Sequence, residues 1–427
     1  MFKKFFGLFL LLLVVACETV KIPQTGSGNS IQNQPYDNID TISVNISQKN
    51  KLKVGILLPL TGTAAKVGNS MLQSAELSLF NSKSNNIVLM PYDTKGTSFG
   101  AVDAINAAVR DEIDIIIGPL FTQSTKAILD IAETNDLLVL SFSDNQSLLE
   151  KNNPNLYLMG LTPQQEIYRI ISYLIDYKGA YGFSAMFPTD AYGNMVSKDF
   201  KNTIFRKDAK IVKTEFYSKK DPNLQKKVNN LLNTNTFREE VYTKYEEELQ
   251  IAKTEGLTSE VEFTYTDEDK IFADALLVPD SGEELLKIGQ YVFDYTGQHK
   301  PLLVGTSKWL NNSLYNNPNF NNTLFVAPNL DSYTDFENLY LSTYGSYPIR
   351  VSALAYDAVK VVIESYAKTK NKEDLRYAIE NYQGFNGANG KFRFLSTGLL
   401  ERRLAIIRIS NGTYEIIDYD NEPFLKY

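Results

Sequence analysis

From residue 53 onward, short continuous apolar runs alternate with amphipathic stretches, and this alternation restricts the fold more than any other feature. The first run, residues 53–60, is followed by a stretch in which Val67, Met71 and Ala75 recur at helical spacing. An uninterrupted apolar run is typical of a parallel strand buried on both faces, and the amphipathic stretch is typical of a helix that covers such a sheet. The alternation therefore predicts an α/β fold built from doubly wound, Rossmann-like lobes.

The same rhythm continues after Pro154 and again after Pro301. A chain of 427 residues is longer than the roughly 250–300 residues at which a single hydrophobic core stops growing, so two lobes are expected. From residue 385 the apolar and polar residues alternate singly, which predicts a small antiparallel ending.

A charged, helix-prone block at residues 235–270 interrupts the rhythm of the second lobe. We interpret this block as an insertion. It is either a solvent-exposed helical flap or an arm that docks a partner.

The first 16 residues predict a cleavable export signal, because Lys3 and Lys4 precede an apolar run that ends at Ala16. The run is shorter than the about 20 apolar residues that a membrane-spanning helix needs. Its end, VVAC, resembles a bacterial lipobox, which implies lipidation of Cys17. The alternative is an ordinary cleaved signal in which Cys17 is incidental.

Residues 17–50 are rich in Asn, Gln, Ser, Gly and Thr, so they predict a flexible tether between the lipid anchor and the folded domain. Fully extended, a tether of this length spans about 100 Å. Glu18 follows the lipidated residue. By resemblance to the sorting rule of bacteria with two membranes, this residue implies anchoring in the outer membrane on its periplasmic face.

Composition excludes several classes of function. The chain has 43 basic and 50 acidic residues, one His and one Cys. A net charge of −7 argues against nucleic-acid binding, and zinc sites made of several Cys or His ligands are impossible. His299 lies in a polar segment without a neighbouring nucleophile. We therefore expect no enzyme, no cofactor and no metal site.

Several long motifs resemble type I periplasmic binding proteins of the leucine/isoleucine/valine-binding class: LPLTGTAAKVGNSMLQSAELSLF, IIIGPLFTQSTKAILDIAETNDLLVLSFS and VSALAYDAVKVVIES. A second set resembles the lipoproteins known as penicillin-binding protein activators: GPLFTQS, SFSDNQSL, YLMGLTPQQEI, DAYG, GTSKW, ALAYDA, GFNGANGKFRF and ERRLAIIRISNG.

The resemblance implies two lobes joined by three crossovers, near Gly160, Pro301 and Gly384. Lobe 1 would comprise residues 51–160 and 301–384, and lobe 2 residues 161–300 and 385–427. A ligand would bind between the lobes.

Two functions follow from the resemblance. The first is a non-enzymatic outer-membrane lipoprotein that activates a peptidoglycan synthase, a penicillin-binding protein, by direct contact. The alternative is a tethered receptor that delivers an amino acid or a related small acid to an ABC transporter permease.

Five candidate ligand-binding residues lie in turns after lobe 1 strands: Thr61, Thr122, Ser124, Ser141 and Ser143. Hydroxyls and free backbone N–H groups at the start of a helix suit a carboxylate, although Thr122 could simply cap its helix. In the amino-acid receptors that the chain resembles, the corresponding turn is Ser-Ala-Thr-like and binds the ligand carboxylate. The sequence places Phe142 within this turn and Asp144 beside it, so we expect Phe142 to obstruct a ligand carboxylate and Asp144 to repel it.

Two further candidates lie in lobe 2. Tyr192 matches a tyrosine that closes over the ligand in the resembled family, with packing at the start of a helix as the alternative. Asp280 follows a strand and could hold a ligand ammonium group, with a solvated turn residue as the alternative.

Overall fold

The computed structural model describes residues 51–150, 153–255, 258, 261–369, 371, 374–420 and 423–424. The predicted signal at residues 1–16, Cys17 and the predicted tether lie outside the described residues. None of the helices within the described ranges is long and apolar enough to cross a membrane.

Lobe 1 is built on a five-stranded parallel sheet with the order β2-β1-β3-β4-β5. Its strands are β1 (Leu52–Leu58), β2 (Ile87–Asp93), β3 (Ile115–Ile117), β4 (Leu138–Ser141) and β5 (Leu156–Leu158). Apolar side chains of α1 (Ala65–Ser82) and α11 (Ala353–Thr369) cover one face, and those of α2 (Ser98–Arg110) and α3 (Thr122–Thr134) cover the other.

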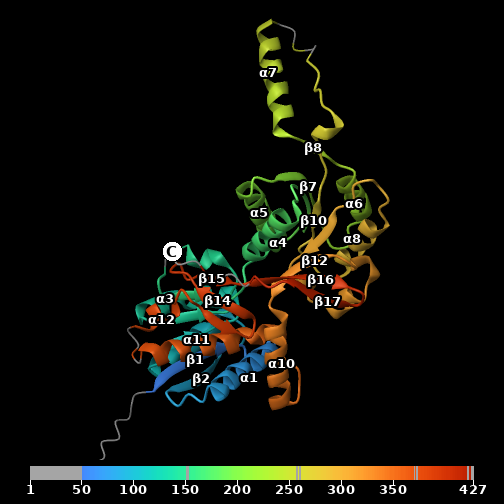
Figure 1. Cartoon of the computed structure of the whole chain (residues 1–427). Coiled ribbons are helices and arrows are strands. Elements are labelled where there is room, and N and C mark those ends of the chain that lie inside the picture. The colour runs from blue at the N-terminus through green and yellow to red at the C-terminus, as the bar shows by residue number, and fades with distance from the viewer. Residues whose placement is uncertain are drawn as a thin grey trace, which may run out of the picture. The chain divides into compact units, whose positions relative to one another are not determined.

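Lobe 2 is built on a seven-stranded sheet with the order β17-β16-β12-β11-β10-β6-β7. The strands are β6 (Gly182–Pro188), β7 (Lys210–Tyr217), β10 (Ala275–Leu277), β11 (Leu302–Gly305), β12 (Leu324–Pro328), β16 (Leu404–Ser410) and β17 (Thr413–Asp418). One core contains α4 (Pro163–Lys178) and α5 (Ala191–Arg206), and the other contains α6 (Leu224–Leu232), α8 (Glu283–Asp294) and α9 (Asn312–Tyr315). Figure 1 shows the two lobes stacked one above the other.

The division of the chain between the lobes differs from the predicted boundaries. Strand β11 pairs with β10 and β12 pairs with β11, so residues 302–328 belong to the lobe 2 sheet and not to lobe 1. The chain returns to lobe 1 with α10 (Leu330–Tyr344), α11 and α12 (Leu375–Ile379). The sequence of a short apolar strand is compatible with either sheet, so only tertiary pairing determines which sheet the strand joins.

The C-terminal part differs from the prediction in the same way. Strands β13 (Phe385–Gly387), β14 (Gly390–Phe394) and β15 (Leu400–Arg402) form an antiparallel sheet whose aromatic residues enter the lobe 1 core. Of the C-terminal strands, β16 and β17 join lobe 2, where β16 pairs antiparallel with β12 and β17 pairs antiparallel with β16. The chain thus changes lobe after β5, after β12 and after β15.

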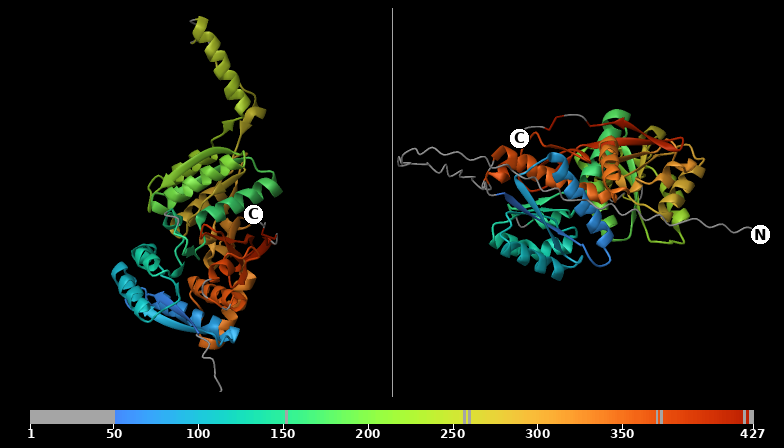
Figure 2. Two further views of the ribbon diagram at one scale, coloured as in Figure 1. Left: turned by 90° about the vertical axis from the view of Figure 1, so that its left-hand side faces the viewer. Right: turned by 90° about the horizontal axis from the view of Figure 1, so that it is seen from below.

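The charged insertion forms an arm that projects from lobe 2 on the side away from lobe 1 (Figures 1 and 2). Its base is a two-stranded ribbon of β8 (Thr236–Phe237) and β9 (Lys270–Ile271), and its main element is α7 (Glu239–Glu255). Short 3-10 helices complete the described structure: η1 (Gln146–Leu149), η3 (Asp267–Asp269), η4 (Ser307–Trp309), η5 (Pro318–Phe320) and η6 (Arg350–Ser352).

A fully buried ion pair joins α11 to β15. The Asp357 and Arg402 side chains are 0% and 1% exposed, and a distance of 3.3 Å separates Oδ2 from Nη2. The other carboxylate oxygen accepts a hydrogen bond of 2.5 Å from the Ala388 backbone N–H. Burial raises the pKa of Asp357, and Arg402 opposes that shift. Each charge therefore depends on the other for stabilisation.

We predict that Asp357→Ala lowers the free energy of unfolding by about 3–5 kcal/mol, because it leaves a buried guanidinium without a partner. Urea denaturation of the purified protein measures this loss. The matched control is Glu364→Ala, which removes the half-exposed pair with Lys360 from the same helix and should cost less than about 1 kcal/mol. Equal losses in the two variants would contradict the prediction.

Candidate ligand site between the lobes

The candidate site lies where turns that follow parallel strands of both sheets approach one another. In open α/β sheets, ligands bind outside the carboxyl ends of the strands. Asp144, which follows β4 of lobe 1, is near enough to Glu166 and Tyr192 of lobe 2 to influence the pKa of both side chains. The two sets of turns therefore face each other.

Two pairs of hydroxyls hold the lobe 1 turns together. The Thr122 and Ser143 hydroxyl oxygens are 2.8 Å apart, and those of Thr125 and Ser141 are 2.7 Å apart. The Ser143 backbone N–H also donates to the Ser141 hydroxyl. The structure therefore brings the predicted Thr122 and Ser143 together, whereas Ser141 is fully buried beneath them and bonds to Thr125.

Thr122 does not cap its helix. Phe121 occupies the N-cap position of α3, and no side-chain hydrogen bond caps this helix. The Thr122 hydroxyl is half-buried and turns toward Ser143 instead. The predicted Ser124 is buried, and its hydroxyl has no hydrogen-bond partner within the described residues.

The obstruction of the turn that the sequence predicts for Phe142 is not present in the structure. Its side chain is 4% exposed and packs in the lobe 1 core against the strands. Successive side chains of an extended segment point to opposite sides, so Phe142 turns inward between Ser141 and Ser143. Asp144 is exposed beside the turn.

The Thr61 hydroxyl is hydrogen-bonded to a neighbouring carboxylate. Its hydroxyl donates to Asp93 at 2.5 Å, and the backbone N–H groups of Leu60, Thr61 and Lys95 donate to the same side chain. Partial burial alone would raise the pKa of Asp93, but these hydrogen bonds lower it overall. The first turn of lobe 1 is thereby fixed around an ionised carboxylate.

On lobe 2, the Tyr192 ring forms the centre of the site. Asp190 caps α5 by accepting from the Gly193 backbone N–H at 2.7 Å, and Tyr192 is partly buried against the lobe 2 core, as the packing alternative predicted. The Lys308 ammonium lies 4.1 Å from the centroid of the Tyr192 ring, which is a cation–π distance. Burial, followed by the charge of Glu166, raises the pKa of Tyr192, so its hydroxyl remains protonated.

Asp280 is held by the protein rather than left as a solvated turn residue. Its carboxylate accepts hydrogen bonds of 2.7 Å from the Tyr217 hydroxyl and 2.8 Å from the Ser281 backbone N–H. Burial and the charge of Asp280 raise the pKa of Tyr217. Asp280 also contributes to the raised pKa of Tyr192, which places it in the same group.

Glu166, the most deeply buried carboxyl group of the site, is not among the residues predicted from the sequence. Glu166 lies in the first turn of α4 and accepts a hydrogen bond of 2.8 Å from the Ser307 backbone N–H. Burial raises its pKa to about 7, despite the opposing effects of that hydrogen bond and of Lys308. A charged residue at the start of the first helix after a lobe crossing was the signal that could have identified it.

The charges of the site favour a cationic group. Asp144, Glu166 and Asp280 bring three carboxyl groups near Tyr192. The Lys308 ammonium lies over the Tyr192 ring and also influences Glu166. On the opposite lobe, the half-buried Thr122 can offer a hydroxyl to a second polar group, and the buried Ser143 hydroxyl holds it in place. The arrangement can orient a small molecule that carries an ammonium group at one end.

His299 stacks on Phe272, with ring centroids 3.8 Å apart, rather than joining this site. Among the described residues, no group of three or more His, Cys, Asp or Glu side chains could hold a metal ion.

Comparison with known proteins supports a binding-protein fold. Residues 51–234 match the family model described as periplasmic binding protein. An uncharacterized protein of Rickettsia prowazekii (strain Madrid E) is 22% identical over 388 residues, which cover 89% of this chain and 92% of that protein.

Solved structures agree with that result. A Rhodospirillum rubrum protein assigned as a branched-chain amino acid ABC transporter superposes with a TM-score of 0.68 at 17% identity, covering 86% of this chain and 100% of that one. The LivJ substrate-binding protein of Streptococcus pneumoniae, solved with isoleucine, has a TM-score of 0.54 at 17% identity, with coverage of 86% and 100%. The chain therefore has the α/β fold of type I periplasmic binding proteins, of the leucine-binding-protein kind.

We predict that Glu166→Gln changes how stability depends on pH. The raised pKa means that the neutral carboxyl group stabilises the fold fully below about pH 4.5, and that this contribution is lost as the pH rises through about 7. Glutamine keeps an acceptor for Ser307 but does not titrate. Between pH 5 and pH 8, the variant should therefore gain up to about 3 kcal/mol in free energy of unfolding relative to the wild type.

Urea denaturation at a series of pH values measures this gain. Glu133→Gln, at an exposed position of α3, is the matched control and should leave the pH profile unchanged. Parallel profiles for Glu166→Gln and the wild type would show that Glu166 is not a buried titrating group.

Proposed function

We propose that this protein binds a small solute carrying an ammonium group, such as an amino acid or an amino-acid-containing cell-wall fragment, between its two lobes. The observation that carries this proposal is the influence of Asp144, the residue after Ser143 of the lobe 1 hydroxyl pair, on Tyr192 of lobe 2. An amino acid presents a carboxylate and an ammonium group a short distance apart, which matches hydroxyl donors on one lobe and carboxyl groups on the other. The isoleucine-bound structure with the same fold supports this choice.

A receptor of this kind would deliver its solute to an ABC transporter permease. The export signal and the lipobox ending at Cys17 support a lipid anchor, Glu18 supports placement at the periplasmic face of the outer membrane, and the residues after Cys17 would form a tether. Membrane fractionation of a Cys17→Ser variant checks the anchor, since the lipid-free protein should appear in the soluble fraction.

We predict that one member of a panel of amino acids and peptidoglycan fragments raises the thermal unfolding temperature of the protein. A ligand at 100 times its dissociation constant adds about 2.7 kcal/mol to the free energy of unfolding. The double substitution Thr122→Val with Ser143→Ala removes the facing hydroxyls and should weaken binding at least about tenfold, which corresponds to about 1.4 kcal/mol.

The control is Thr134→Val, the same hydroxyl-to-methyl change at the exposed end of α3, which should leave binding intact. If a ligand binds equally well to the double variant, the site does not lie between the lobes. If no member of the panel binds, the receptor function fails for these solutes.

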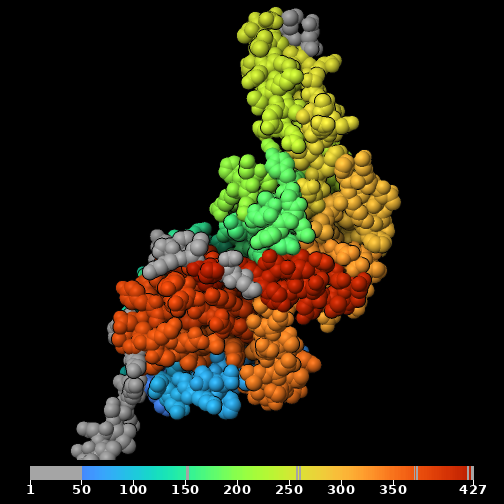
Figure 3. Space-filling view, viewed as in Figure 1, coloured from blue at the N-terminus to red at the C-terminus, as the bar shows by residue number. Residues whose placement is uncertain are grey.

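A second candidate function is favoured by the arm. We propose, as the alternative, that the protein activates a peptidoglycan synthase by contact through α7. The helix carries the acidic run Glu246–Glu248 beside Ile251, whose side chain is 59% exposed. A space-filling view shows the arm standing clear of lobe 2 (Figure 3). An acidic helix with an exposed apolar residue suits a partner surface that is basic around an apolar centre.

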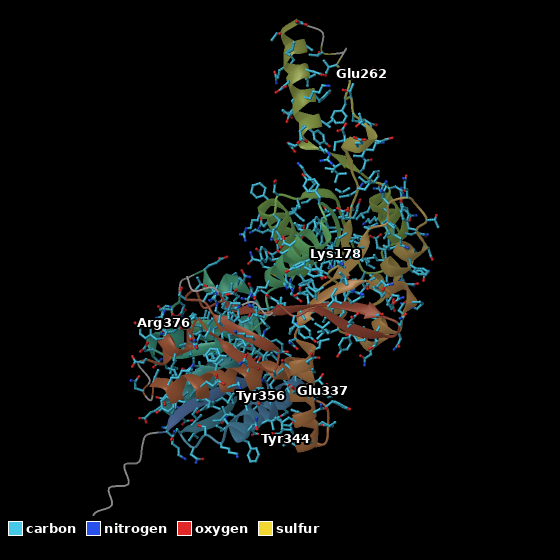
Figure 4. All side chains as sticks on the ribbon, in the orientation of Figure 1. Lys178, Glu262, Glu337, Tyr344, Tyr356 and Arg376 are labelled. Atoms are coloured by element: carbon cyan, nitrogen blue, oxygen red, sulfur yellow. The ribbon has the colours of Figure 1, made fainter. Side chains whose placement is uncertain are left out.

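The base of the arm is held firmly enough to present that surface. Aromatic rings of Phe237, Tyr242 and Phe263 pack together, with the Phe237 and Phe263 centroids 5.0 Å apart. Glu239 at the start of α7 forms an ion pair with Lys210 of β7. Figure 4 labels Glu262 on the segment that runs beside the helix.

For this alternative we predict that reversing the charges of Glu246, Glu247 and Glu248 to Lys abolishes stimulation of a purified penicillin-binding protein from the same cells. The assay is the rate of glycan polymerisation and crosslinking with and without the full-length protein. Reversal of Glu112, Asp130 and Glu133, exposed acidic residues of lobe 1, is the matched control and should keep full stimulation. A wild-type protein that does not change either rate would exclude the activator function.

A further inference from the structure

A separate cavity lies beside the crossover from lobe 2 to α10, away from the inter-lobe site. Its volume is about 380 Å³. Leu310, Asn312, Tyr315 and Tyr414 line it from lobe 2. The opposite wall consists of residues of α10 and of the segment that leads into η6: Leu330, Tyr333, Thr334, Glu337, Pro348 and Arg350. Figure 4 labels Glu337 on α10.

Arg350 is the cationic group of this cavity, and its charge is poorly satisfied. The guanidinium carbon lies 3.5 Å from the centroid of the Tyr333 ring. Its Nη2 atom is buried and has no hydrogen-bond partner within the described residues. Burial lowers the pKa of Arg350, opposed by Tyr333, Tyr315 and Glu337. A buried cation held mainly by an aromatic face gains from any anion that reaches it.

The rest of the lining combines aromatic and aliphatic side chains with polar ones such as Asn312 and Thr334. Tyr315 is buried, its ring centroid lies 5.4 Å from that of Tyr414, and burial raises the pKa of its hydroxyl to about 12. Leu310, Leu330 and Pro348 supply aliphatic surface. Pockets for small molecules are commonly concave, mostly apolar and about 300–1,000 Å³ in volume, with a few polar groups that fix orientation.

The polar groups define the class of ligand. A guanidinium matches the planar geometry of a carboxylate, which can accept two parallel hydrogen bonds from it. Glu337 is near enough to influence Arg350, although no ion pair joins them within the described part of the chain. Its negative charge disfavours a doubly charged anion such as phosphate. A single carboxylate on an aromatic or apolar body suits the cation together with the tyrosines and aliphatic side chains that form part of the walls.

We propose that this crossover cavity is a second binding site, which takes a small apolar or aromatic monocarboxylate with its carboxylate on Arg350. The cavity shares no lining residue with the proposed solute site between the lobes.

The test is isothermal titration of the full-length protein with benzoate, with its neutral isostere benzamide and with inorganic phosphate. Benzoate should bind and benzamide should not.

Arg350→Met keeps the aliphatic stem and should weaken benzoate binding at least about tenfold. Glu337→Gln should strengthen it, because the repelling charge is removed. Lys178→Met removes an exposed cation of α4 and should leave the affinity unchanged.

A second variant distinguishes loss of the Arg350–ligand contact from a structural change caused by replacing Arg350. Asn312→Trp fills the cavity from an exposed position without altering the guanidinium, and it should also abolish binding. The unfolding temperature of each variant confirms that it is folded. Benzoate binding that survives both Arg350→Met and Asn312→Trp would overturn the proposal. Preference for phosphate, equal binding of benzamide, or no benzoate binding at about 10 mM would overturn it as well.

Discussion

The contact between Asp357 and Arg402 fixes the place where β15 leaves lobe 1 for lobe 2. Arg402 ends β15, and its buried guanidinium is neutralised by a carboxylate of α11. Its backbone N–H donates to Gln165 of α4, whose side-chain amide in turn donates to the Leu400 carbonyl. The last crossover is therefore bonded to both lobes at once. Glu166 is the next residue of α4, so the same bonds help to set the position of the candidate site.

Much of the fold could be predicted from the sequence, because buried parallel strands have a distinctive pattern. The α/β lobes, the insertion and the antiparallel ending all follow from such patterns. The assignment of β11 and β12 to a lobe did not follow, because their apolar runs suit either sheet. The pairing of β11 with β10 depends on tertiary contacts, and no local sequence pattern indicates it.

The candidate site could be predicted only in part for a similar reason. Turn hydroxyls such as Thr122 and Ser143 are recognisable because they follow strands, and the structure pairs them. The expected obstruction by Phe142 was wrong, because the sequence does not show which side of the turn its ring occupies. Glu166 was missed because its importance comes from burial against Ser307, which is far away in the sequence.

These findings change the balance between the two functions considered. With Phe142 packed in the core, its ring does not obstruct the lobe 1 turn, and this removes one objection to solute binding. The acidic arm has no evident role in solute binding, and it is the feature that keeps the activator function in consideration. Both functions are compatible with one molecule, since a ligand that closes the lobes could change how the arm is presented.

The most direct test is the distance between the lobes in solution, with and without a bound solute. Spin labels at Gln123 and Asn194, exposed positions near the site on opposite lobes, report that distance in a Cys17→Ser background without other cysteines. Hinge closure around a solute predicts that the distance shortens when a ligand that stabilises the protein is added. An unchanged distance at saturating ligand would show that the solute binds elsewhere and would contradict a ligand site between the lobes.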